Sequence, residues 1–341
     1  MRSPVVSILF PYRNSSKFIH RSIESIREQS VDDWELIAVN DQSTDGTDQK
    51  IRKIIGSDPR VRLFNCRSSG IVPALNLAIK ESRSELLIRM DSDDFMSYDR
   101  LEKQIEFLKE NPDIGVVASR VKYRCKEKTA VHSGFERYVE WSNSLMEREE
   151  ISFHRFEESP IVHPSVAFRK SLCELHGDYR NGLFPEDYEL WLRWFSKGVE
   201  IHKLPEYLLD WYDDQNRASR IGTKYTRLGF QQIRARYLGK WLDENNLSGK
   251  SLIGWGAGKI ARSQLNCLAE NQIFLDRIYD VDPKKIGKLC SGVPVHSIED
   301  FSLKSAEFML IFCGSHDVKA EIGQFLKDKN LAHGLNYLFF G

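Results

Sequence analysis

The sequence predicts an α/β protein that contains two successive sheets. Short apolar runs alternate with amphipathic stretches over the first hundred residues, and the alternation starts again after Gly249. The length of 341 residues is a prior for about two domains. Because near-continuous apolar strands separated by helices are typical of parallel sheets, we expect a doubly wound, mostly parallel sheet followed by a small Rossmann-like α/β domain.

The elements of the first sheet follow one another closely. The expected strands cover residues 5–10, 35–39, 61–64 and 86–90. The helices between them are expected near residues 19–26, 51–55 and 74–79. Ile19, Ile23 and Ile26, for example, share one helical face. Asn14, Ser15 and Ser16 offer side-chain oxygens for the N-cap of that helix.

The middle of the chain is less regular. We expect a strand with one basic face at 120–128, and helices at 187–197 and 225–245. Strands then return at 251–254, 278–280 and 308–313. The predicted division is a first domain over 1–222, a helical linker over 223–248 and an accessory domain over 249–341.

Composition excludes several classes of protein. Lys and Arg number 49, as do Asp and Glu, so the net charge is zero, which argues against a nucleic-acid binder. No apolar run approaches the ~20 residues that span a bilayer, and the N-terminus lacks a signal-peptide pattern. The six scattered cysteines indicate free thiols in a reducing compartment, so we expect a cytoplasmic protein. Any contact with the inner face of the membrane would be peripheral. It could use a basic helix face that contains Arg227, Arg234, Arg236 and Lys240. For this face, simple exposure to solvent is favoured over lipid binding.

The strongest chemical signal is a buried strand that runs out into Asp91, Asp93 and Asp94. In open α/β sheets, ligands bind beyond the carboxyl ends of the strands. Asp91 and Asp93 could bring oxygens to one hard divalent cation, Mg²⁺ or Mn²⁺. An acidic turn that caps the helix near Ser97 explains the same residues equally well.

Two further acidic motifs follow the same logic. Asp41 ends another strand and could accept a hydrogen bond from a nucleobase, or it could organise an Asx turn. Glu186 and Asp187 begin a helix. There they could complement the macrodipole, which the spacing alone favours, or one could serve as a general base.

Taken in order, these motifs resemble the family-two glycosyltransferases of GT-A fold. The resemblance rests on PYRN, DWELIAVNDQSTDGT, SGIVPALNLAI, LLIRMDSDD, SPIVHPSVAFRK and FPEDYELWLRW, and it covers about residues 4–220. It implies a nucleotide pocket formed by Pro11, Arg13, Asn14, Asp41, Gly70, Ala74 and Asn76. It also implies metal ligation by Asp91 and Asp93, a donor or acceptor contact at His163, and catalysis by Asp187 beside Glu186.

Two positions depart from the family pattern. Many members carry a tyrosine where this chain has Arg13. Many also carry a histidine where counting back from Ser219 places Asp214, which could be a third metal ligand, a phosphate-side group or part of a polar turn. Arg217 and Arg220 could instead contact the diphosphate.

The resemblance implies an inverting, metal-dependent transfer of a sugar from a nucleoside diphosphate, with UDP as the family-level expectation. The acceptor would be a hydroxyl on a glycan, a lipid-linked molecule or a soluble compound, in polysaccharide or glycoconjugate synthesis. The alternative is a non-catalytic sugar-nucleotide-binding or assembly protein that keeps the fold.

A glycine-rich turn opens the accessory domain. Gly254, Gly256 and Gly258 follow a strand and precede a helix, and Asp280 ends the next strand, which is the context of a dinucleotide fingerprint. The segment also resembles the Rossmann-like domains at the N-terminus of sugar acyltransferases. Nucleotide binding and a structural or dimerising role are equally supported; NAD-dependent redox chemistry is a third hypothesis.

Overall fold

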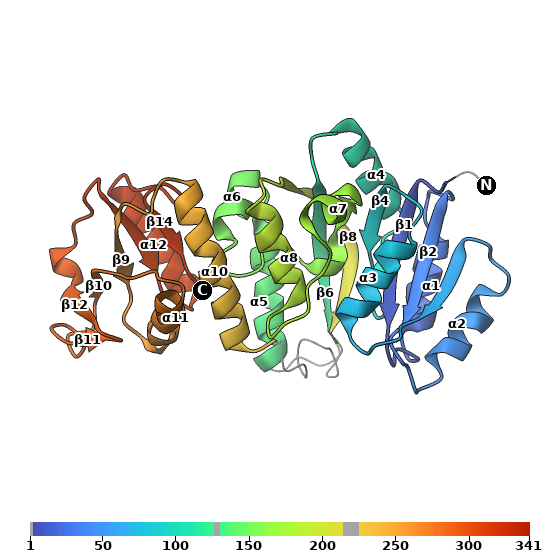
Figure 1. Cartoon of the computed structure of the whole chain (residues 1–341), viewed down its shortest axis with the longest axis horizontal. Helices are drawn as coiled ribbons and strands as arrows, with labels where there is room; N and C mark the ends of the chain where they lie inside the picture. Colours follow the sequence, from blue (N-terminus) through green and yellow to red (C-terminus); the bar gives the residue numbers. More distant parts are fainter. Residues whose placement is uncertain (1–2, 126–129, 214–224) are drawn as a thin grey trace. The chain divides into compact units, whose positions relative to one another are not determined.

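A computed structural model describes residues 3–125, 130–213 and 225–341 and confirms the α/β fold (Figure 1). The chain divides into two compact units, each with its own sheet and core. The first unit contains residues Met1–Ile151, Pro160–Asn181 and Lys197–Gly222. The second contains Ser152–Ser159, Gly182–Ser196 and Thr223–Gly341.

The first unit is built on an eight-stranded sheet with the order β3-β2-β1-β4-β7-β6-β8-β5. Its strands are β1 (Val6–Tyr12), β2 (Trp34–Asn40), β3 (Val61–Asn65), β4 (Leu86–Arg89), β5 (Phe95–Met96), β6 (Val116–Cys125), β7 (Ala167–Arg169) and β8 (Ile201–Asp213). Strands β1 to β4 pair in parallel, as expected. Strand β7 runs antiparallel to both β4 and β6, and β5 to β8, so the sheet is mixed.

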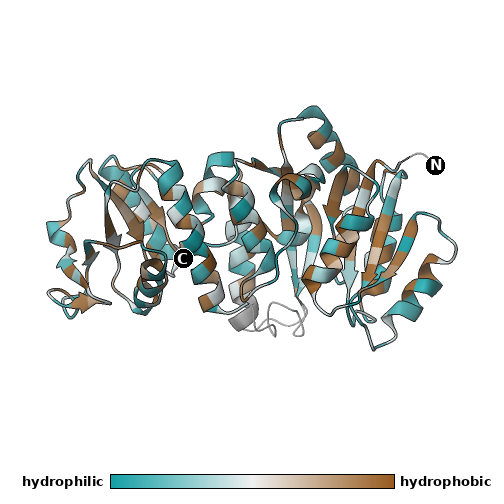
Figure 2. Cartoon of the chain, viewed as in Figure 1, coloured by the Kyte–Doolittle hydropathy of each residue, from teal (hydrophilic) through white to brown (hydrophobic). Residues whose placement is uncertain are grey.

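Seven helices of the described structure belong wholly or partly to this unit. They are α1 (Ile19–Arg27), α2 (Thr47–Ile55), α3 (Ile71–Glu81), α4 (Arg100–Glu110), α5 (Ala130–Ser144), α6 (Arg148–His154) and α7 (Ser171–His176). Every residue of β1 is buried, so successive side chains are covered on both faces of the sheet. Figure 2 shows the central strands as largely hydrophobic and α2 as largely hydrophilic on its outer side.

The N-cap prediction for α1 is wrong. Phe18 occupies the N-cap, and no side chain caps the helix. The Asn14 amide oxygen instead accepts a hydrogen bond from the Thr44 backbone N–H (2.9 Å), so it joins two loops. Long-range loop contacts of this kind leave no local sequence signal.

The second unit holds a six-stranded sheet with the order β11-β12-β10-β9-β13-β14. Its strands are β9 (Ser251–Trp255), β10 (Arg277–Asp280), β11 (Leu289–Cys290), β12 (Val293–Ser297), β13 (Glu307–Ile311) and β14 (Tyr337–Phe339). The pairings described in this sheet are parallel except that of β11 with β12. Its helices include α8 (Glu186–Phe195), α10 (Arg227–Glu244), α11 (Lys259–Glu270) and α12 (His316–Asp328).

Helix α10 packs as part of this unit, whereas the sequence analysis treats residues 223–248 as a linker. Ile233, Leu238 and Trp241 are buried in the same apolar cluster as Leu252 of β9. Arg234, expected on a basic face, is also buried (6 % exposed) and donates to the Tyr188 hydroxyl. Burial on several sides explains why the helix shows no simple amphipathic pattern.

Among the helices that the structure describes, none is both long and apolar enough to cross a membrane.

Candidate functional site

The candidate site lies at one edge of the first sheet, where β1, β2 and β4 end. Strand order reverses in sequence between β1 and β4, which is the topological switch point where open α/β sheets bind ligands. The last pair between these strands is Leu9 with Arg89. Pro11 lies beyond that pair, where the missing N–H of proline costs no ladder bond to β4. The loops after both strands diverge from this point.

Asp41 connects three loops at this edge. Its Oδ1 accepts a hydrogen bond from the Gly70 backbone N–H at 2.7 Å, and its Oδ2 lies 3.5 Å from Nη1 of Arg13. Arg13 also donates to Ser69 Oγ (2.6 Å), and its side chain is about half exposed. Gly70 precedes α3 with φ 129°, a conformation that other residues rarely adopt. Arg13, Asp41 and Gly70, three predicted site residues, are thus brought together.

The Asx-turn interpretation applies to neighbours of Asp41. Asn40 Oδ1 accepts from the Ser43 backbone N–H (2.9 Å), and Asp45 Oδ1 accepts from that of Thr47 (3.1 Å). Asp45 Oδ2 also accepts from the Ser16 N–H (3.0 Å). Burial disfavours the charged form of Asp45, but the hydrogen bonds from Thr47 and Ser16 outweigh it and lower the pKa to about 2. These contacts hold the loop that presents Asp41.

Three carboxylates gather after β4. One oxygen from each of Asp91, Asp93 and Asp94 lies within 4.8 Å of the others. Asp94 is fully buried and accepts a hydrogen bond from the Tyr212 backbone N–H (2.8 Å), which ties this turn to β8. Asp91 and Asp93 are only partly buried. A pair of hard oxygen donors at a solvent-accessible strand end fits Mg²⁺ or Mn²⁺, which keep several waters.

The capping interpretation of this acidic turn is not what the structure shows. Helix α4 begins at Arg100, with Asp99 at the N-cap. The turn is held instead by side chains of α1: Ser22 Oγ donates to the Asp91 carbonyl (3.1 Å), and Arg21 donates to the Asp93 carbonyl. The acidic turn is therefore fixed through its backbone.

Sequence reasoning missed Arg89, the last residue of β4. Its Nη2 donates to Asp91 Oδ1 at 2.6 Å, and its side chain is 3 % exposed. Burial disfavours its charge, but the surrounding groups, with the Asp91 carboxylate the largest contributor and Asp94 a further one, together outweigh this and raise the pKa of Arg89. A signal was present: Arg89 is a charge inside an apolar run, and residues i and i+2 of a strand share a face.

His163 and Asn76 meet at a second missed residue, Tyr179. The Tyr179 hydroxyl lies 2.7 Å from Nε2 of His163. The Asn76 amide group donates to the Tyr179 carbonyl (2.9 Å) and accepts from the Tyr179 N–H (3.1 Å). Asn76 and Tyr179 are 103 residues apart in the sequence, so no local sequence pattern predicts this pair of hydrogen bonds. The resemblance predicts a nucleotide contact for Asn76; the structure gives its side chain a partner in the protein.

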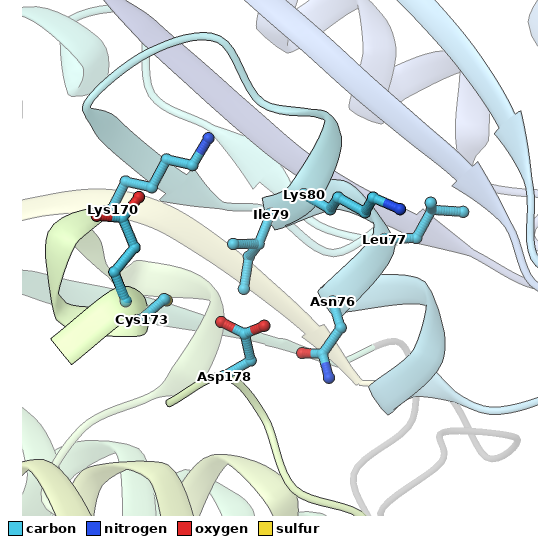
Figure 3. A pocket seen from close by; sticks show the side chains of 8 residues that line it. Asn76, Leu77, Ile79, Lys80, Lys170, Cys173 and Asp178 are labelled. Atoms are coloured by element: carbon cyan, nitrogen blue, oxygen red, sulfur yellow. The ribbon is translucent and has the colours of Figure 1, made fainter. Parts of the chain in front are cut away.

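Asn76 also lines a cavity of about 490 Å³ between α3 and α7 (Figure 3). Among the described residues around this cavity, Asn76 is the one that the sequence analysis assigns to the donor site. The lining is formed by Asn76, Leu77, Ile79, Lys80, Lys170, Cys173, Glu174 and Asp178. The strand-end loops with Asp41 and Asp91 do not contribute to it, so this cavity differs from the predicted nucleotide site.

The predicted catalytic acids belong to the second unit, at the N-terminus of α8. Glu186 is buried, and both its carboxylate oxygens accept from the Tyr225 hydroxyl (2.8 and 2.9 Å). Asp187 is only partly buried, and its Oδ1 accepts from the Tyr188 N–H (2.8 Å). Both acids lie in the first turn of α8, at the positive end of the helix dipole. Of the two, Asp187 is the more accessible.

The glycine-rich turn follows β9, as predicted, and Asp280 ends β10. Asp280 Oδ2 accepts from the Ala257 N–H (2.7 Å), Oδ1 accepts from the Asp282 N–H (2.8 Å), and Lys285 pairs with the carboxylate at 3.0 Å. Burial disfavours the charge, but these contacts lower the pKa of Asp280. Asp280 therefore holds the turn itself.

Packing explains two of the three glycines. A Cβ on Gly256 would lie 2.7 Å from the Phe312 carbonyl oxygen, and φ there is +92°. A Cβ on Gly254 would lie 2.9 Å from the Ile278 side chain. A Cβ on Gly258 would meet nothing within 4 Å.

Asp214, Arg217 and Arg220 lie outside the described residues, so the roles suggested for them stay predictions.

Comparisons with known proteins bear on the family and the fold of the chain. Residues 7–176, just under half of the chain, match the family model described as glycosyl transferase family 2. The chain is 30% identical over 242 residues to the bifunctional glycosyltransferase pgtA of Dictyostelium discoideum, covering 59% of this chain and 31% of that protein. It is 28% identical over 244 residues to the UDP-Gal:alpha-D-GlcNAc-diphosphoundecaprenol beta-1,3-galactosyltransferase of Escherichia coli, covering 69% and 83%.

Other relatives are longer proteins. The match to the chondroitin synthase of Pasteurella multocida is 38% identical over 110 residues and covers 32% of this chain and 11% of that protein. The chain thus spans about a third or less of pgtA and of this synthase. Among solved structures, TarS of S. aureus in complex with UDP aligns with a TM-score of 0.51 at 17% identity, covering 78% of this chain and 70% of TarS, a likeness of fold. The chain therefore carries a glycosyltransferase domain of family 2.

Proposed function

We propose that this protein transfers a sugar from a nucleoside-diphosphate sugar to an acceptor hydroxyl, with inversion at the anomeric carbon. The observation that carries the proposal is the presence of Asp41 and the Asp91–Asp93 pair at the switch-point edge of the first sheet. The family 2 domain and the relatives named as glycosyltransferases support it.

Asp91 and Asp93 are the residues that would hold Mg²⁺ or Mn²⁺. When bound there, the cation acts as a Lewis acid that offsets charge on the departing diphosphate. Positively charged side chains lie next to these carboxylates. The buried guanidinium of Arg89 interacts with Asp91 and Asp94, and that of Arg100 with Asp94, so two cations lie behind the acidic turn. Their positive charges offset part of the mutual repulsion of the three carboxylates.

The donor's nucleotide would lie against the loops after β1 and β2. Asp41 would accept a hydrogen bond from a nucleobase N–H, with its carboxylate already oriented by the Gly70 N–H. Pro11, Arg13 and Asn14 would line the same pocket. UDP is the proposed nucleotide, because TarS was crystallised with UDP and with UDP-GlcNAc and the E. coli relative is named for UDP-Gal.

Asp187 is the proposed base. Its carboxylate would take the proton of the acceptor hydroxyl as that oxygen attacks the anomeric carbon. The new bond joins the acceptor oxygen to the anomeric carbon. The bond from that carbon to the diphosphate breaks, and its electron pair leaves with the nucleoside diphosphate. A single displacement of this kind inverts the configuration.

The acceptor is proposed at the level of class: a hydroxyl of a glycan or of a lipid-linked saccharide. The name of the E. coli relative includes a diphosphoundecaprenol, and another relative is a chondroitin synthase. A lipid-linked acceptor would be met by peripheral contact at the cytoplasmic face of the membrane. For the second unit we propose a structural role, because the protein itself already uses both Asp280 oxygens.

The decisive experiment is a donor screen with Mg²⁺ and Mn²⁺ that measures release of nucleoside diphosphate with and without acceptor saccharides. Acceptor-dependent release supports the enzyme. Tight donor binding without release supports the non-catalytic sugar-nucleotide-binding protein instead.

Asp187→Asn tests the base. We expect kcat to fall about 10²–10⁴-fold, because a positioned base contributes about that much, while donor affinity stays within about twofold. Thermal denaturation of Asp187→Asn, beside the neighbouring variant Glu186→Gln, shows whether either change disturbs folding at this helix N-terminus. Full transfer activity in a folded Asp187→Asn variant would remove the base assignment.

A further inference from the structure

Arg89 is a buried cation at the end of β4. It closes a four-residue strand that is otherwise apolar. Its Nη2 donates to Asp91 Oδ1 at 2.6 Å, whereas its Nε and Nη1 are buried without a hydrogen-bond partner in the part of the chain that the structure describes. Burying a guanidinium with two such groups costs free energy that an apolar residue would avoid.

The surrounding contacts hold Arg89 in one position. Arg100 donates to the Arg89 backbone carbonyl at 3.0 Å and donates to Gln104 through its Nε at 3.0 Å. The bond from Arg100 thus holds the Arg89 backbone, and the bond to Asp91 holds its guanidinium.

We propose that Arg89 is a positioning residue: it fixes the orientation of the Asp91 carboxylate so that this group can bind the divalent cation. The proposal rests on the proposed function. It explains why a costly buried charge stands two residues before Asp91, on the same face of the extended chain. Partners behind a metal ligand orient it, and their loss weakens metal affinity by about 10–100-fold.

The experiment measures Mn²⁺ binding in the presence of UDP, by electron paramagnetic resonance and calorimetry, on the full chain. The variants are Arg89→Met, Arg89→Lys, Asp91→Asn and the double variant Arg89→Met/Asp91→Asn. Arg62→Met serves as the matched control, since Arg62 pairs with Glu35 at 3.1 Å in the same sheet and contacts none of the acidic turn in the described structure. Thermal denaturation reports folding.

We expect Arg89→Met to weaken Mn²⁺ binding about 10–100-fold and Arg62→Met to leave it within about twofold. In the Asp91→Asn background, Arg89→Met should change the affinity less than about threefold, because a residue that acts through Asp91 has nothing left to position. Arg89→Lys keeps the charge but not the guanidinium fork, so its affinity should fall between those of the wild type and Arg89→Met. If Arg89→Met does not fold, Arg89→Lys and its double variant with Asp91→Asn carry the same comparison.

Two results would overturn the proposal: unchanged Mn²⁺ affinity in folded Arg89→Lys and Arg89→Met, or an equal loss with and without Asp91. Failure of the proposed function is a different result, in which the wild-type protein binds neither Mn²⁺ nor UDP.

Discussion

The two sheets of this protein present similar edges but do different things with them. In each unit an acidic residue at the end of the second strand accepts a backbone N–H from a glycine-containing turn at 2.7 Å: Asp41 from Gly70, and Asp280 from Ala257. Asp280 also binds the Asp282 N–H and Lys285, so both of its oxygens serve the turn. Within the described residues, the Asp41 carboxylate has, besides Gly70, only the long contact to a half-exposed Arg13.

The two sheets also differ in how many acidic residues gather at their strand ends. After β4, Asp91, Asp93 and Asp94 form the one group of three potential metal ligands found in residues 3–125, 130–213 and 225–341. The second sheet has no such group in its described part. The candidate ligand site is therefore the edge of the first sheet, where three acids gather, and not that of the second, where both Asp280 oxygens accept hydrogen bonds from the same turn region.

The largest expected effect comes from Asp93→Asn, which removes one of the two partly buried carboxylates proposed to hold the cation. We expect kcat/KM for transfer to fall at least about 10³-fold, because the lost cation contributes several kcal/mol to the transition state. Initial rates over a Mn²⁺ titration measure it. The matched change in the other sheet, Asp280→Asn, should leave transfer within about twofold; equal losses in both variants would contradict the comparison.

A smaller effect is expected from Asp41→Asn. A hydrogen bond to a charged acceptor contributes about 1.5–3 kcal/mol, so the donor KM should rise about 10–100-fold with little change in kcat. Steady-state kinetics with the preferred donor give both constants. Asp58→Asn is the control, because Asp58 pairs with Arg60. A fall in kcat at unchanged KM would show that Asp41 does not act in donor binding.

Asp280→Asn is expected to have the smallest effect on activity but to lower the stability of the fold. The variant weakens the bonds to Ala257, Asp282 and Lys285 and should lower the free energy of unfolding by about 1–3 kcal/mol. Urea denaturation at pH 7 measures it. Nucleotide or NAD affinity should be unaffected; loss of a measurable affinity in this variant would reinstate a ligand site in the second unit.

The pH dependence sharpens the same test. Because the folded pKa of Asp280 lies below its unfolded value of about 3.9, its stabilisation is present above that pH and is lost as the pH falls towards the folded pKa. The stability difference between the wild type and Asp280→Asn should therefore be full at pH 7 and shrink below about pH 4. A difference that stays constant from pH 7 to pH 3 would show that the carboxylate charge is not the cause.

The sequence by itself determined the α/β class, the two sheets and the polar strand ends. Apolar runs of strand length are local signals, and carboxylates directly after such a run must lie at the carboxyl edge of the sheet. Asp41, Asp91 and Asp93 could be chosen on that basis, and the ordered motifs pointed to the family.

Only the tertiary structure decided which polar groups have partners inside the protein. Three examples are the hydrogen bonds between Asn76 and Tyr179, the bond from Gly70 to Asp41 and the bond from Ala257 to Asp280. Each joins segments that share no periodic pattern in the sequence. It also placed α10 in the core of the second unit and Arg234 in its interior. The physical reason is that hydrogen-bond satisfaction and burial depend on how distant segments pack, whereas strand and helix periodicity depend on neighbours in the chain.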